Sequence, residues 1–475
     1  MNHALSESLR EMEVMRLVSE VACRRKDPSY LVGGALRDAS LGRTLKDLDF
    51  ATRKPYAVAQ EIARRLGSRV VSMGREEPLT YRIPHDGGTM DWAGLAGGTL
   101  ESDLVRRDFT VNAMAMDVVT GELSDPHGGL SDLESRRLRM TSPTVFEEDP
   151  LRILKAYRML AELDGFRLEP RTQEAMRAGR SGLGAVAEER IEHEIELLLV
   201  APRPGRVVRA MAESGILFSV LPPLKRMEGL VQNEYHHADA LNHTLEVLEA
   251  LDAPAGWIGD LGLPAFGRRE WFVVRLAALF HDAGKAETRS EGEDGRIHFY
   301  GHQKHSADIA RAALERLRFP GGIVRDVAEL CLNHLRPLGL TKSRPGRTAY
   351  RRLVHSMGEI FPLLLALSYA DKLGSRGSGH EDNLQNLARL IADVLKIART
   401  DGPELERLPK LIDGLEALSI LGLSRPGPLL GRALDALMDR QVAGEISTRE
   451  QAIPFLEAWA EKHLGQRSTG SASGS

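Results

Sequence analysis

The sequence predicts an α+β protein of several domains, in which an N-terminal α/β part precedes a long all-helical part. Residues 28–140 alternate short apolar runs with helical patterns and turns, as a sheet covered by helices does. After Thr141 the strand signals nearly vanish, and helical patterns follow one another to about residue 465. A chain of 475 residues exceeds one ordinary hydrophobic core, so we expect roughly two to four domains.

Changes in pattern and Pro/Gly punctuation divide the chain further. The first residues interleave charged side chains with Met and Leu, which indicates an amphipathic helix rather than a signal peptide. The final Gly/Ser-rich residues are typical of disorder. We therefore expect an N-terminal helix at 1–27, the α/β part at 28–140, a helical segment at 141–225, a histidine-rich helical domain at 226–395, a helical C-terminal region at 396–465 and a disordered tail at 466–475.

Composition narrows the compartment and the partners. Cys23 and Cys331 are isolated thiols, which argues against a disulfide framework and fits a reducing cytoplasm. The longest apolar run, at residues 361–367, is too short to span a bilayer, so we expect no membrane partner. The formal net charge of −4 does not exclude RNA, because phosphate contacts need a local basic patch rather than a basic total.

The first motif runs from Tyr30 to Thr52. An apolar start reads as a buried strand that ends at Gly33-Gly34, and paired glycines let backbone N–H groups approach an anion. A helix is predicted to follow, and then a strand that contains Asp47 and Asp49. Side chains two apart on a strand share a face, so these carboxylates are expected to hold a pair of Mg²⁺ ions beside a phosphate.

The second motif is RRDFTVNA at residues 106–113. Arg107 offers a planar fork that suits phosphate oxygens. Asp108 and Asn112 are four apart, so on a helix they would share a face and could hold a ribose or triphosphate; the alternative is a capping Asp and an exposed Asn. Asp91, in a short expected strand, could join the carboxylate pair or face solvent.

The third motif, Glu148-Asp149-Pro150-Leu151-Arg152, is predicted to begin a long helix with Pro150 at its first position and Asp149 as its N-cap. Asp149 and Arg152 lie three apart, on one side of the helix start. A fixed acceptor and double donor can imitate a Watson–Crick edge. Base reading and capping compete for the Asp149 carboxylate.

The fourth pattern is an ordered set of histidines and aspartates on a helical background. Imidazoles and carboxylates from several helices can build a site for one or two transition metals such as Mn, Ni, Co or Fe. His305 could compete with His302, and Lys285 could stabilise a phosphate charge, while His236, His237 and His298 lie outside the pattern. The predicted ligands are His243, His281, Asp282, His302, His334 and Asp371.

The first three motifs, in this order, resemble those of the class II tRNA nucleotidyltransferase and bacterial poly(A) polymerase family: GGxxRD, DxD, RRDxxxNA, EDxxR and, at Glu189–Glu194, ERIxxE. The resemblance implies a nucleotidyltransferase (polymerase beta-like) head followed by an all-α neck, an HD domain and a tail. It also implies template-independent addition of C and/or A to the tRNA 3′ end from CTP and ATP, with Mg²⁺. The residues it implies as catalytic are Asp47, Asp49 and Arg107, and those it implies as nucleotide-binding are Gly33, Gly34, Arg37, Arg107, Asp108, Asn112, Asp149, Arg152, Arg158 and Arg190.

The fourth pattern resembles the HD-type metal-dependent phosphohydrolases, which implies a second activity on phosphoesters such as a 2′,3′-cyclic phosphate. Three alternatives remain at this point. A poly(A) polymerase is disfavoured because residues 70–77 lack the family's GRRF-like run. A hydrolase with a nucleotide-sensing head is disfavoured by the intact head motifs, and a non-catalytic tRNA-binding protein would tolerate Asp47→Ala. The motifs do not separate addition of CCA, of CC only or of A only.

Overall fold

The computed structural model describes residues 2–74, 79–232, 238–252, 256–343, 345–375 and 380–464. Three predicted features lie outside this part of the chain: residues 75–77 of the segment compared with the GRRF-like run, the pair His236 and His237, and the predicted tail. The chain forms two compact units. Unit 1 comprises residues 1–201 and 207–220, and unit 2 comprises residues 202–206 and 221–475.

The N-terminus holds two helices where the sequence predicted one. Helix α1 spans Asn2–Glu11 and α2 spans Glu13–Arg25. The prediction of a single helix was wrong because Met12 between them is extended, with φ −61° and ψ 133°, and an extended residue ends a helix. Helix α2 packs against α4 (Pro55–Arg65), and its apolar side chains, such as Met15 and Val18, are buried.

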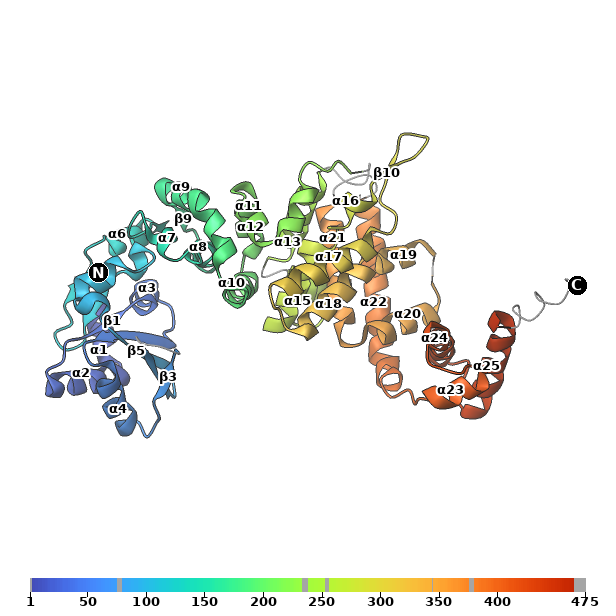
Figure 1. Ribbon diagram of the computed structural model, residues 1–475, viewed down its shortest axis with the longest axis horizontal. Helices are drawn as coiled ribbons and strands as arrows, with labels where there is room; N and C mark the ends of the chain where they lie inside the picture. The colour runs from blue at the N-terminus through green and yellow to red at the C-terminus, as the bar shows by residue number, and fades with distance from the viewer. Residues whose placement is uncertain are drawn as a thin grey trace, which may run out of the picture. The chain divides into compact units, whose positions relative to one another are not determined.

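Unit 1 is built on a seven-stranded mixed sheet in the order β3-β4-β5-β2-β1-β6-β7 (Figure 1). Only the β2–β5 pair is parallel in this sheet, and it places Asp49 opposite Asp91. The strands are β1 Ser29–Val32, β2 Asp47–Thr52, β3 Val71–Met73, β4 Thr80–His85, β5 Gly88–Gly94, β6 Ala115–Asp117 and β7 Leu123–Ser124.

The side-chain alternation expected for the first motif is present in β2. Leu48 and Phe50 are buried, whereas Asp47 and Asp49, which alternate with them, are open to solvent. Phe50 stacks on Trp92 of β5 with ring centroids 4.4 Å apart, so the apolar face of the strand pair is locked into the core. Helix α3 (Gly34–Ser40) packs against β2, and α4 packs against β4 and β5. The core therefore fixes the direction of the two carboxylates.

The rest of unit 1 is mainly helical: α5 Leu100–Val105, α6 Gly129–Glu134, α7 Val145–Glu148, α8 Arg152–Glu162, α9 Pro170–Gly179, α10 Glu188–Val200 and α12 Ile216–Val220. Helix α11, Pro204–Glu213, begins among the residues of unit 2 and continues into unit 1. Two short strands, β8 Arg137–Leu138 and β9 Arg167–Leu168, pair in parallel. Two-residue strands carry too little alternation for a sequence to reveal them.

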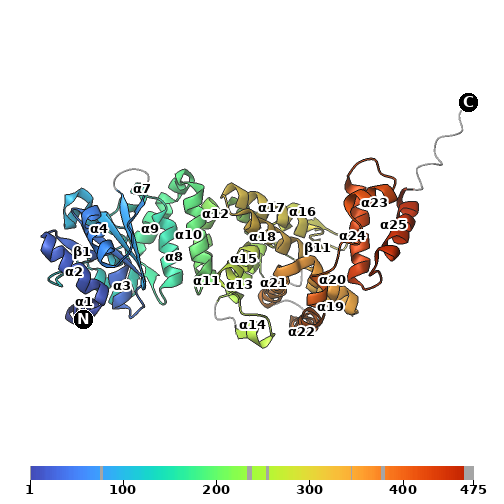
Figure 2. The ribbon, with the colours of Figure 1, turned by 90° about the horizontal axis from the view of Figure 1, so that it is seen from below.

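Unit 2 is helical apart from a small hairpin of β10 (Ser290–Glu291) and β11 (Ile297–His298) (Figure 2). Its first part packs α13 and α15 against α18 and α21. The helices are α13 Ala240–Ala250, α14 Gly256–Asp260, α15 Arg268–Phe280, α16 Lys285–Thr288, α17 His302–Arg316, α18 Gly321–Asn333, α19 Arg336–Ser343, α20 Arg347–Met357, α21 Phe361–Gly374, α22 His380–Leu405, α23 Gly414–Ile420, α24 Pro428–Val442 and α25 Arg449–Leu464.

One stretch, residues 347–374, is long and apolar enough by length and composition to cross a membrane. It is longer than the apolar run seen in the sequence because α20 and α21 follow each other through a single 3-10 turn at Gly358–Ile360. Of its most apolar window, 56% is buried inside the protein, and α21 packs against α13, α15 and α18. Core helices of globular proteins have the same properties.

Candidate functional site

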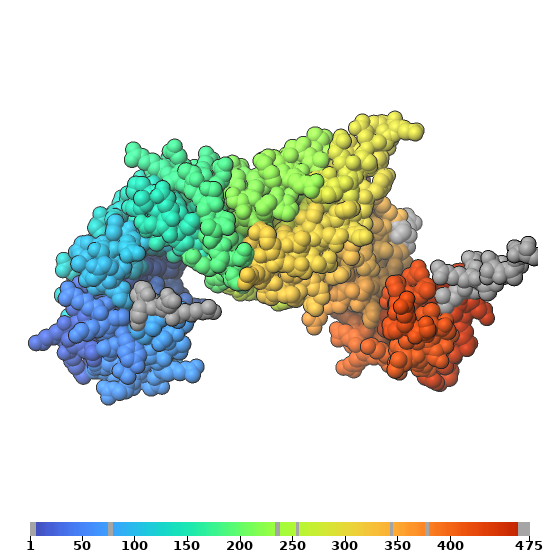
Figure 3. All heavy atoms as spheres, viewed as in Figure 1, coloured from blue at the N-terminus to red at the C-terminus, as the bar shows by residue number. Residues whose placement is uncertain are grey.

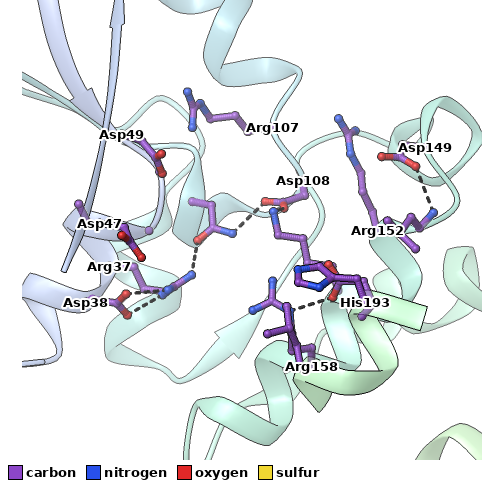
Figure 4. Close-up of a pocket in the computed structure, with 18 of the residues that line it drawn as sticks. Arg37, Asp38, Asp47, Asp49, Arg107, Asp108, Asp149, Arg152, Arg158 and His193 are labelled. Atoms are coloured by element: carbon purple, nitrogen blue, oxygen red, sulfur yellow. Dashed lines mark hydrogen bonds and ion pairs between the residues drawn. The ribbon is translucent and has the colours of Figure 1, made fainter. Parts of the chain in front are cut away.

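Unit 1 contains a cavity of about 880 Å³ between β2, α3, the 106–112 loop, α8 and α10 (Figure 4). This volume lies in the roughly 300–1,000 Å³ range of small-molecule sites. All twelve residues that the sequence assigned to catalysis or nucleotide binding line it: Gly33, Gly34, Arg37, Asp47, Asp49, Arg107, Asp108, Asn112, Asp149, Arg152, Arg158 and Arg190. The fold thus gathers in one cavity motifs that lie up to 157 positions apart, from Gly33 to Arg190.

The carboxylate pair lies on one wall. Thr89 donates a 2.8 Å hydrogen bond to Asp47 Oδ1, and the Asp47 side chain is exposed and lines the cavity. The pKa of Asp49 is raised by its withdrawal from bulk water and by the neighbouring Asp91, against the lowering effect of Arg107 and Lys155. The side chain is still reached by water from the cavity. Two acidic groups with mutual repulsion form a place where a cation lowers the free energy.

Asp91 stands beside Asp49 across the strand pair, as one of the two alternatives expected. Both of its oxygens are bound by Arg82 of β4, at 2.8 and 2.7 Å. Such a bidentate pair holds a carboxylate in one orientation. Sequence reasoning missed Arg82, because only the β4–β5 register brings it opposite Asp91.

Gly33 is required where the cavity meets β2. Its φ of 74° and ψ of −142° belong to a region that side chains rarely adopt. A Cβ at this position would lie 3.0 Å from Asp49 Oδ2 and 3.2 Å from Arg107 Nη1. The glycine therefore lets the backbone come close to both charged groups.

Arg107 is held by a residue that the sequence analysis missed. Its Nε and Nη2 donate to Asp103 Oδ2 at 2.9 and 2.8 Å, and Nη1 remains near Gly33 and Asp49. Asp103 is buried and also accepts the backbone N–H of Ala96. The spacing of four residues before Arg107 was the available signal.

The second motif brings Asp108 and Asn112 together, but not on an α-helix. Phe109 is extended, and a short 3-10 turn at Thr110–Asn112 follows. A loop can curl a side chain back over four residues as a helix does, and Asn112 Nδ2 donates to Asp108 Oδ1 at 2.9 Å. Arg37 Nη1 in turn donates to Asn112 Oδ1 at 2.8 Å.

The charge of Asp108 is balanced from α8. Lys155 Nζ lies 2.5 Å from Asp108 Oδ2. Burial alone would raise the pKa of Asp108, but Lys155, Asn112 and the Phe109 N–H hold it below its usual range. Arg37 is bound by Asp38 through two hydrogen bonds. These contacts order the polar wall of the cavity, seen in the centre of Figure 4.

The Asp149 carboxylate is bound at both oxygens. Oδ1 accepts the Leu151 N–H at 3.2 Å, and Oδ2 accepts Arg190 Nη2 at 2.9 Å. Helix α8 begins at Arg152 after its N-cap Leu151, and no side chain caps it, so the predictions of Asp149 as the N-cap and of Pro150 as the first helical residue were wrong. Arg152 donates to the carbonyls of Val145 and Arg106.

The remaining wall comes from α8 and α10. Arg158 donates to Glu194 and Glu162, both at 2.8 Å, so its charge is compensated inside the protein. His193, one residue before Glu194, is exposed and lines the cavity. His193 was missed although it lies within the ERIxxE element, because a lone His gives no signal of its role.

Unit 2 contains a second polar site, formed by the six predicted HD residues. Three atoms, from His243, His281 and Asp371, lie within 4.8 Å of one another, and so do three from Asp282, His302 and His334. His243 lies on α13, His281 and Asp282 follow α15, His302 begins α17, His334 follows α18 and Asp371 lies on α21. His302 is buried and His305 is exposed, so the structure places His302 in this set.

Backbone carbonyls fix the tautomers of three of these histidines. The Nδ1 atoms of His281, His302 and His334 lie 2.7–2.8 Å from the carbonyl oxygens of Ala278, Phe299 and Cys331. A carbonyl only accepts, so each Nδ1 carries a proton, and in the neutral form of the ring Nε2 presents its lone pair to the cluster. The Nε2 atoms of His302 and His334 face each other at 3.4 Å, which is unfavourable unless a cation lies near both.

The charges of the cluster point the same way. Burial and the neighbouring His281 lower the pKa of His334 to about 3, so this ring is neutral at pH 7. Burial would raise the pKa of Asp282, but Lys285 and His281 hold it well below its usual range. His281 Nε2 is buried with no hydrogen-bond partner among the described residues. Neutral imidazoles and ionised carboxylates are the forms that bind divalent metals.

Both sites thus fit divalent metals, of different kinds. Asp47 and Asp49 supply hard oxygen donors, and Mg²⁺ commonly takes one or two carboxylates and completes its shell with substrate phosphates and water. The unit 2 cluster mixes nitrogen and oxygen donors, which suits Mn, Fe, Co, Ni or Zn. Lys285 Nζ lies 2.6 Å from Asp282 Oδ2 and donates a 2.5 Å hydrogen bond to Gln232 Oε1. The positive charge of Lys285 is therefore compensated by the Asp282 carboxylate.

Known families match three parts of the chain. The poly A polymerase head domain matches residues 29–139, the probable RNA and SrmB-binding site of polymerase A matches 165–227, and the HD domain matches 240–375. Two solved structures are similar at 20% identity. The Thermotoga maritima CCA-adding enzyme complexed with tRNA has a TM-score of 0.58 and is covered over 94% of each chain. A CCA-adding enzyme with CTP has a TM-score of 0.62, with 97% of this chain and 98% of that one covered.

Curated relatives extend over nearly the whole chain. The A-adding tRNA nucleotidyltransferase of Deinococcus radiodurans is 34% identical over 441 residues, which are 92% of this chain and 96% of the relative. The CC-adding tRNA nucleotidyltransferase of Thermus thermophilus is 36% identical over 442 residues, 91% of this chain and 93% of the relative. Identity of this extent, together with the HD domain and the fold, shows that the chain belongs to the tRNA nucleotidyltransferase family of enzymes.

Proposed function

We propose that this enzyme adds C, A or both to the 3′ end of tRNA from CTP and ATP without a nucleic-acid template. The observation that carries the proposal is the cavity of unit 1, where Asp47 and Asp49 lie in the same space as Asp149, Arg152 and Arg190. A carboxylate pair for phosphoryl chemistry therefore shares one site with donors and acceptors suited to a base edge. The names of both curated relatives support the substrate class.

In the proposed reaction the tRNA 3′-hydroxyl attacks the α-phosphate of the nucleotide, a phosphodiester forms, and pyrophosphate leaves. Mg²⁺ held by Asp47 and Asp49 would supply a lowered pKa for the hydroxyl and neutralise charge on the phosphates. Arg107, anchored by Asp103, stabilises phosphate charge from the wall beside Gly33. Asp108 and Asn112 hold the ribose or triphosphate, and the catalytic effect comes from positioning and electrostatics.

A purified-enzyme assay tests this activity. tRNAs that end before the CCA sequence, after C and after CC receive CTP, ATP or both, with Mg²⁺, and Asp49→Ala is compared with Asp86→Ala, an exposed aspartate in the turn between β4 and β5. We expect wild type and Asp86→Ala to extend tRNA and Asp49→Ala to fail. Completion to CCA, a stop after two C residues, or addition of A to CC ends alone distinguishes the three specificities. Long A tails on unrelated RNA would instead indicate a poly(A) polymerase.

We infer a second activity, metal-dependent hydrolysis of a phosphoester, at the HD cluster of unit 2. It is supported by the Nε2 lone pairs of three buried histidines that converge with Asp282 and Asp371. A divalent metal there would supply a hydroxide at neutral pH. The expected result is hydrolysis of a 2′,3′-cyclic nucleotide with Mn²⁺, Ni²⁺, Co²⁺ or Fe²⁺, lost in Asp282→Asn and retained in Asp49→Ala. Absence of hydrolysis with every metal would leave a head-only transferase.

The cytoplasm is the compartment we propose, since ATP, CTP and tRNA are available there and the chain holds two free thiols. Cys23 is exposed and Cys331 is buried, and neither forms a disulfide. An exposed thiol fits a reducing environment. Fractionation of cells that produce the enzyme would place it directly.

A further inference from the structure

The HD cluster opens into a cavity of about 470 Å³ in unit 2 whose other walls have no part in the metal chemistry. Asp282, His302, His334 and Asp371 lie at one wall. The remaining lining is basic, aromatic and apolar: Lys285, His298, Phe299, Tyr300, Leu335, Leu338, Lys342, Lys372, Ser375 and Asn383. The chemistry of this lining indicates which kind of ligand would fit beside the cluster.

Two lysines in this lining remain available to a ligand. Lys285 is committed to Asp282. Lys372 is only 7% exposed and Lys342 is exposed, and neither makes an ion pair with a carboxylate in the described part of the chain. Burial of an ammonium is costly, and a bound phosphate would offset that cost.

The rim of the same cavity carries an aromatic pair. The rings of His298 and Tyr300 stack with centroids 5.0 Å apart and planes 12° from parallel. Tyr300 is still 77% exposed, so the ring has a face that no protein group covers. The pair ends the β10–β11 hairpin, which projects from the surface of unit 2 in Figures 1 and 3. Exposed aromatic faces of this kind stack on nucleobases.

We propose that this cavity is a nucleotide site in which Tyr300 stacks on the base while Lys342 and Lys372 bind the phosphate beside the HD cluster. The proposal rests on the proposed hydrolysis of a nucleotide and assigns the residues outside the metal cluster that recognise the base and the phosphate of that nucleotide. The recognised group is a nucleotide with a terminal phosphate, either free or at the end of an RNA.

Equilibrium binding to the metal-free full-length protein tests this assignment. The probes are adenosine 3′-monophosphate, a short RNA with a 3′-phosphate, and ribose 5-phosphate as the base-free analogue. Unit 1 is identical in wild type and in the variants of Tyr300, Lys342, Lys372 and Lys304, so its own nucleotide binding does not change among them. We expect Tyr300→Ala to weaken binding of one or both base-carrying probes roughly 5- to 100-fold, with ribose 5-phosphate unaffected and Tyr300→Phe close to wild type. Tyr56→Ala, at another exposed tyrosine, is the control.

The lysines should act on all probes alike. Lys342→Met, at an exposed position, and the near-isosteric Lys372→Met are each expected to weaken binding of every probe by about tenfold. Lys304→Met, at another exposed position, should leave binding of every probe unchanged. If Tyr300→Ala changes neither base-carrying probe, or changes ribose 5-phosphate equally, the proposal is overturned. With added Mn²⁺, Tyr300→Ala should raise KM for the nucleotide and leave kcat unchanged. Loss of all hydrolysis would contradict the proposed activity alone, because the metal-free binding is measured separately.

Discussion

Arg190 donates a 2.9 Å hydrogen bond to the same Asp149 carboxylate whose other oxygen accepts the Leu151 N–H at the start of α8. Two motifs that lie 41 positions apart are thereby joined, and the orientation of Asp149 depends on both partners. A carboxylate fixed from two sides presents a defined edge to a base. If Asp149 reads the base as proposed, the exposed Arg190 acts on nucleotide choice through the orientation of this carboxylate.

Removal of the Arg190 side chain should therefore reduce the discrimination between correct and incorrect nucleotides. We expect Arg190→Ala to lower kcat/KM for CTP or ATP about tenfold and to narrow the ratio between correct and incorrect nucleotides, because Asp149 loses one of its two restraints. Steady-state incorporation on a defined tRNA end measures both values. The exposed Arg177→Ala serves as control, and an unchanged selection ratio in Arg190→Ala would contradict this role.

Asp103 should matter to activity although it does not line the cavity. Asp103→Ala removes the acceptor of two Arg107 hydrogen bonds, so the guanidinium loses its fixed position near Asp49. We expect kcat to fall roughly 10- to 100-fold with a smaller change in KM for the nucleotide. Circular dichroism should report an intact fold. Asp103→Asn, which retains one acceptor oxygen, should keep more of the activity than the alanine variant.

Gly33 and Gly42 form a matched pair for the close approach at the cavity. Both have positive φ, 74° and 67°, but a Cβ would meet Asp49 and Arg107 only at Gly33, while Gly42 has open space. Either alanine substitution is expected to cost about 1 kcal/mol of stability from backbone strain. Only Gly33→Ala should lose nucleotide transfer, by at least roughly 100-fold. Thermal unfolding and single-turnover assays separate the two effects, and equal activity in both variants would refute the assignment.

Metal removal should affect unit 2 in a way that can be measured without any substrate. We expect the purified protein to hold a transition metal, detectable by elemental analysis, and His334→Gln to reduce its content by at least about tenfold. Chelation should also lower the unfolding temperature, since a metal that binds the folded cluster stabilises it. Transfer by unit 1 with Mg²⁺ should persist in His334→Gln, and metal content equal to wild type would count against the ligand role.

Asp401 predicts a pH-dependent contribution to stability. Hydrogen bonds from Arg347, against the effect of burial, and from Arg351 hold the pKa of Asp401 below its usual range. A depressed folded-state pKa stabilises the protein above the unfolded value near pH 4, and this stability is lost as the pH falls further. Asp401→Asn should therefore lower the free energy of unfolding at pH 7, and the difference from wild type in urea unfolding should shrink steadily below about pH 4.

Much of the site could be predicted because its residues sit in short motifs with strong local rules. Gly33-Gly34 and the Asp47/Asp49 alternation follow from turn and strand geometry, and the cavity contains both. The partners that hold these residues could not be predicted in the same way. Arg82 reaches Asp91 only through the β4–β5 register, and Arg190 reaches Asp149 only because α10 packs on α8.

Other differences arise where local rules allow two outcomes. RRDFTVNA permits a helix by spacing, but the observed loop and 3-10 turn satisfy the same Asp108–Asn112 contact. Met12 has no helix-breaking side chain, so nothing in the first 27 residues marked the division between α1 and α2. In unit 2, His302 and His305 are both plausible from the pattern, and the structure separates them because His302 is buried whereas His305, three residues later on α17, is exposed.

The way the chain passes between the two units has a consequence for gene rearrangement. Residues 202–206 belong to unit 2 although the residues on both sides of them belong to unit 1, and Gly205 donates its N–H to Asp252 at 2.8 Å. No single breakpoint separates the two units cleanly. A deletion after residue 201 removes residues 207–220 from unit 1, and one after residue 220 takes residues 202–206 from unit 2. Recombination that exchanges either unit alone must therefore repair a discontinuous boundary, which favours inheritance of both together.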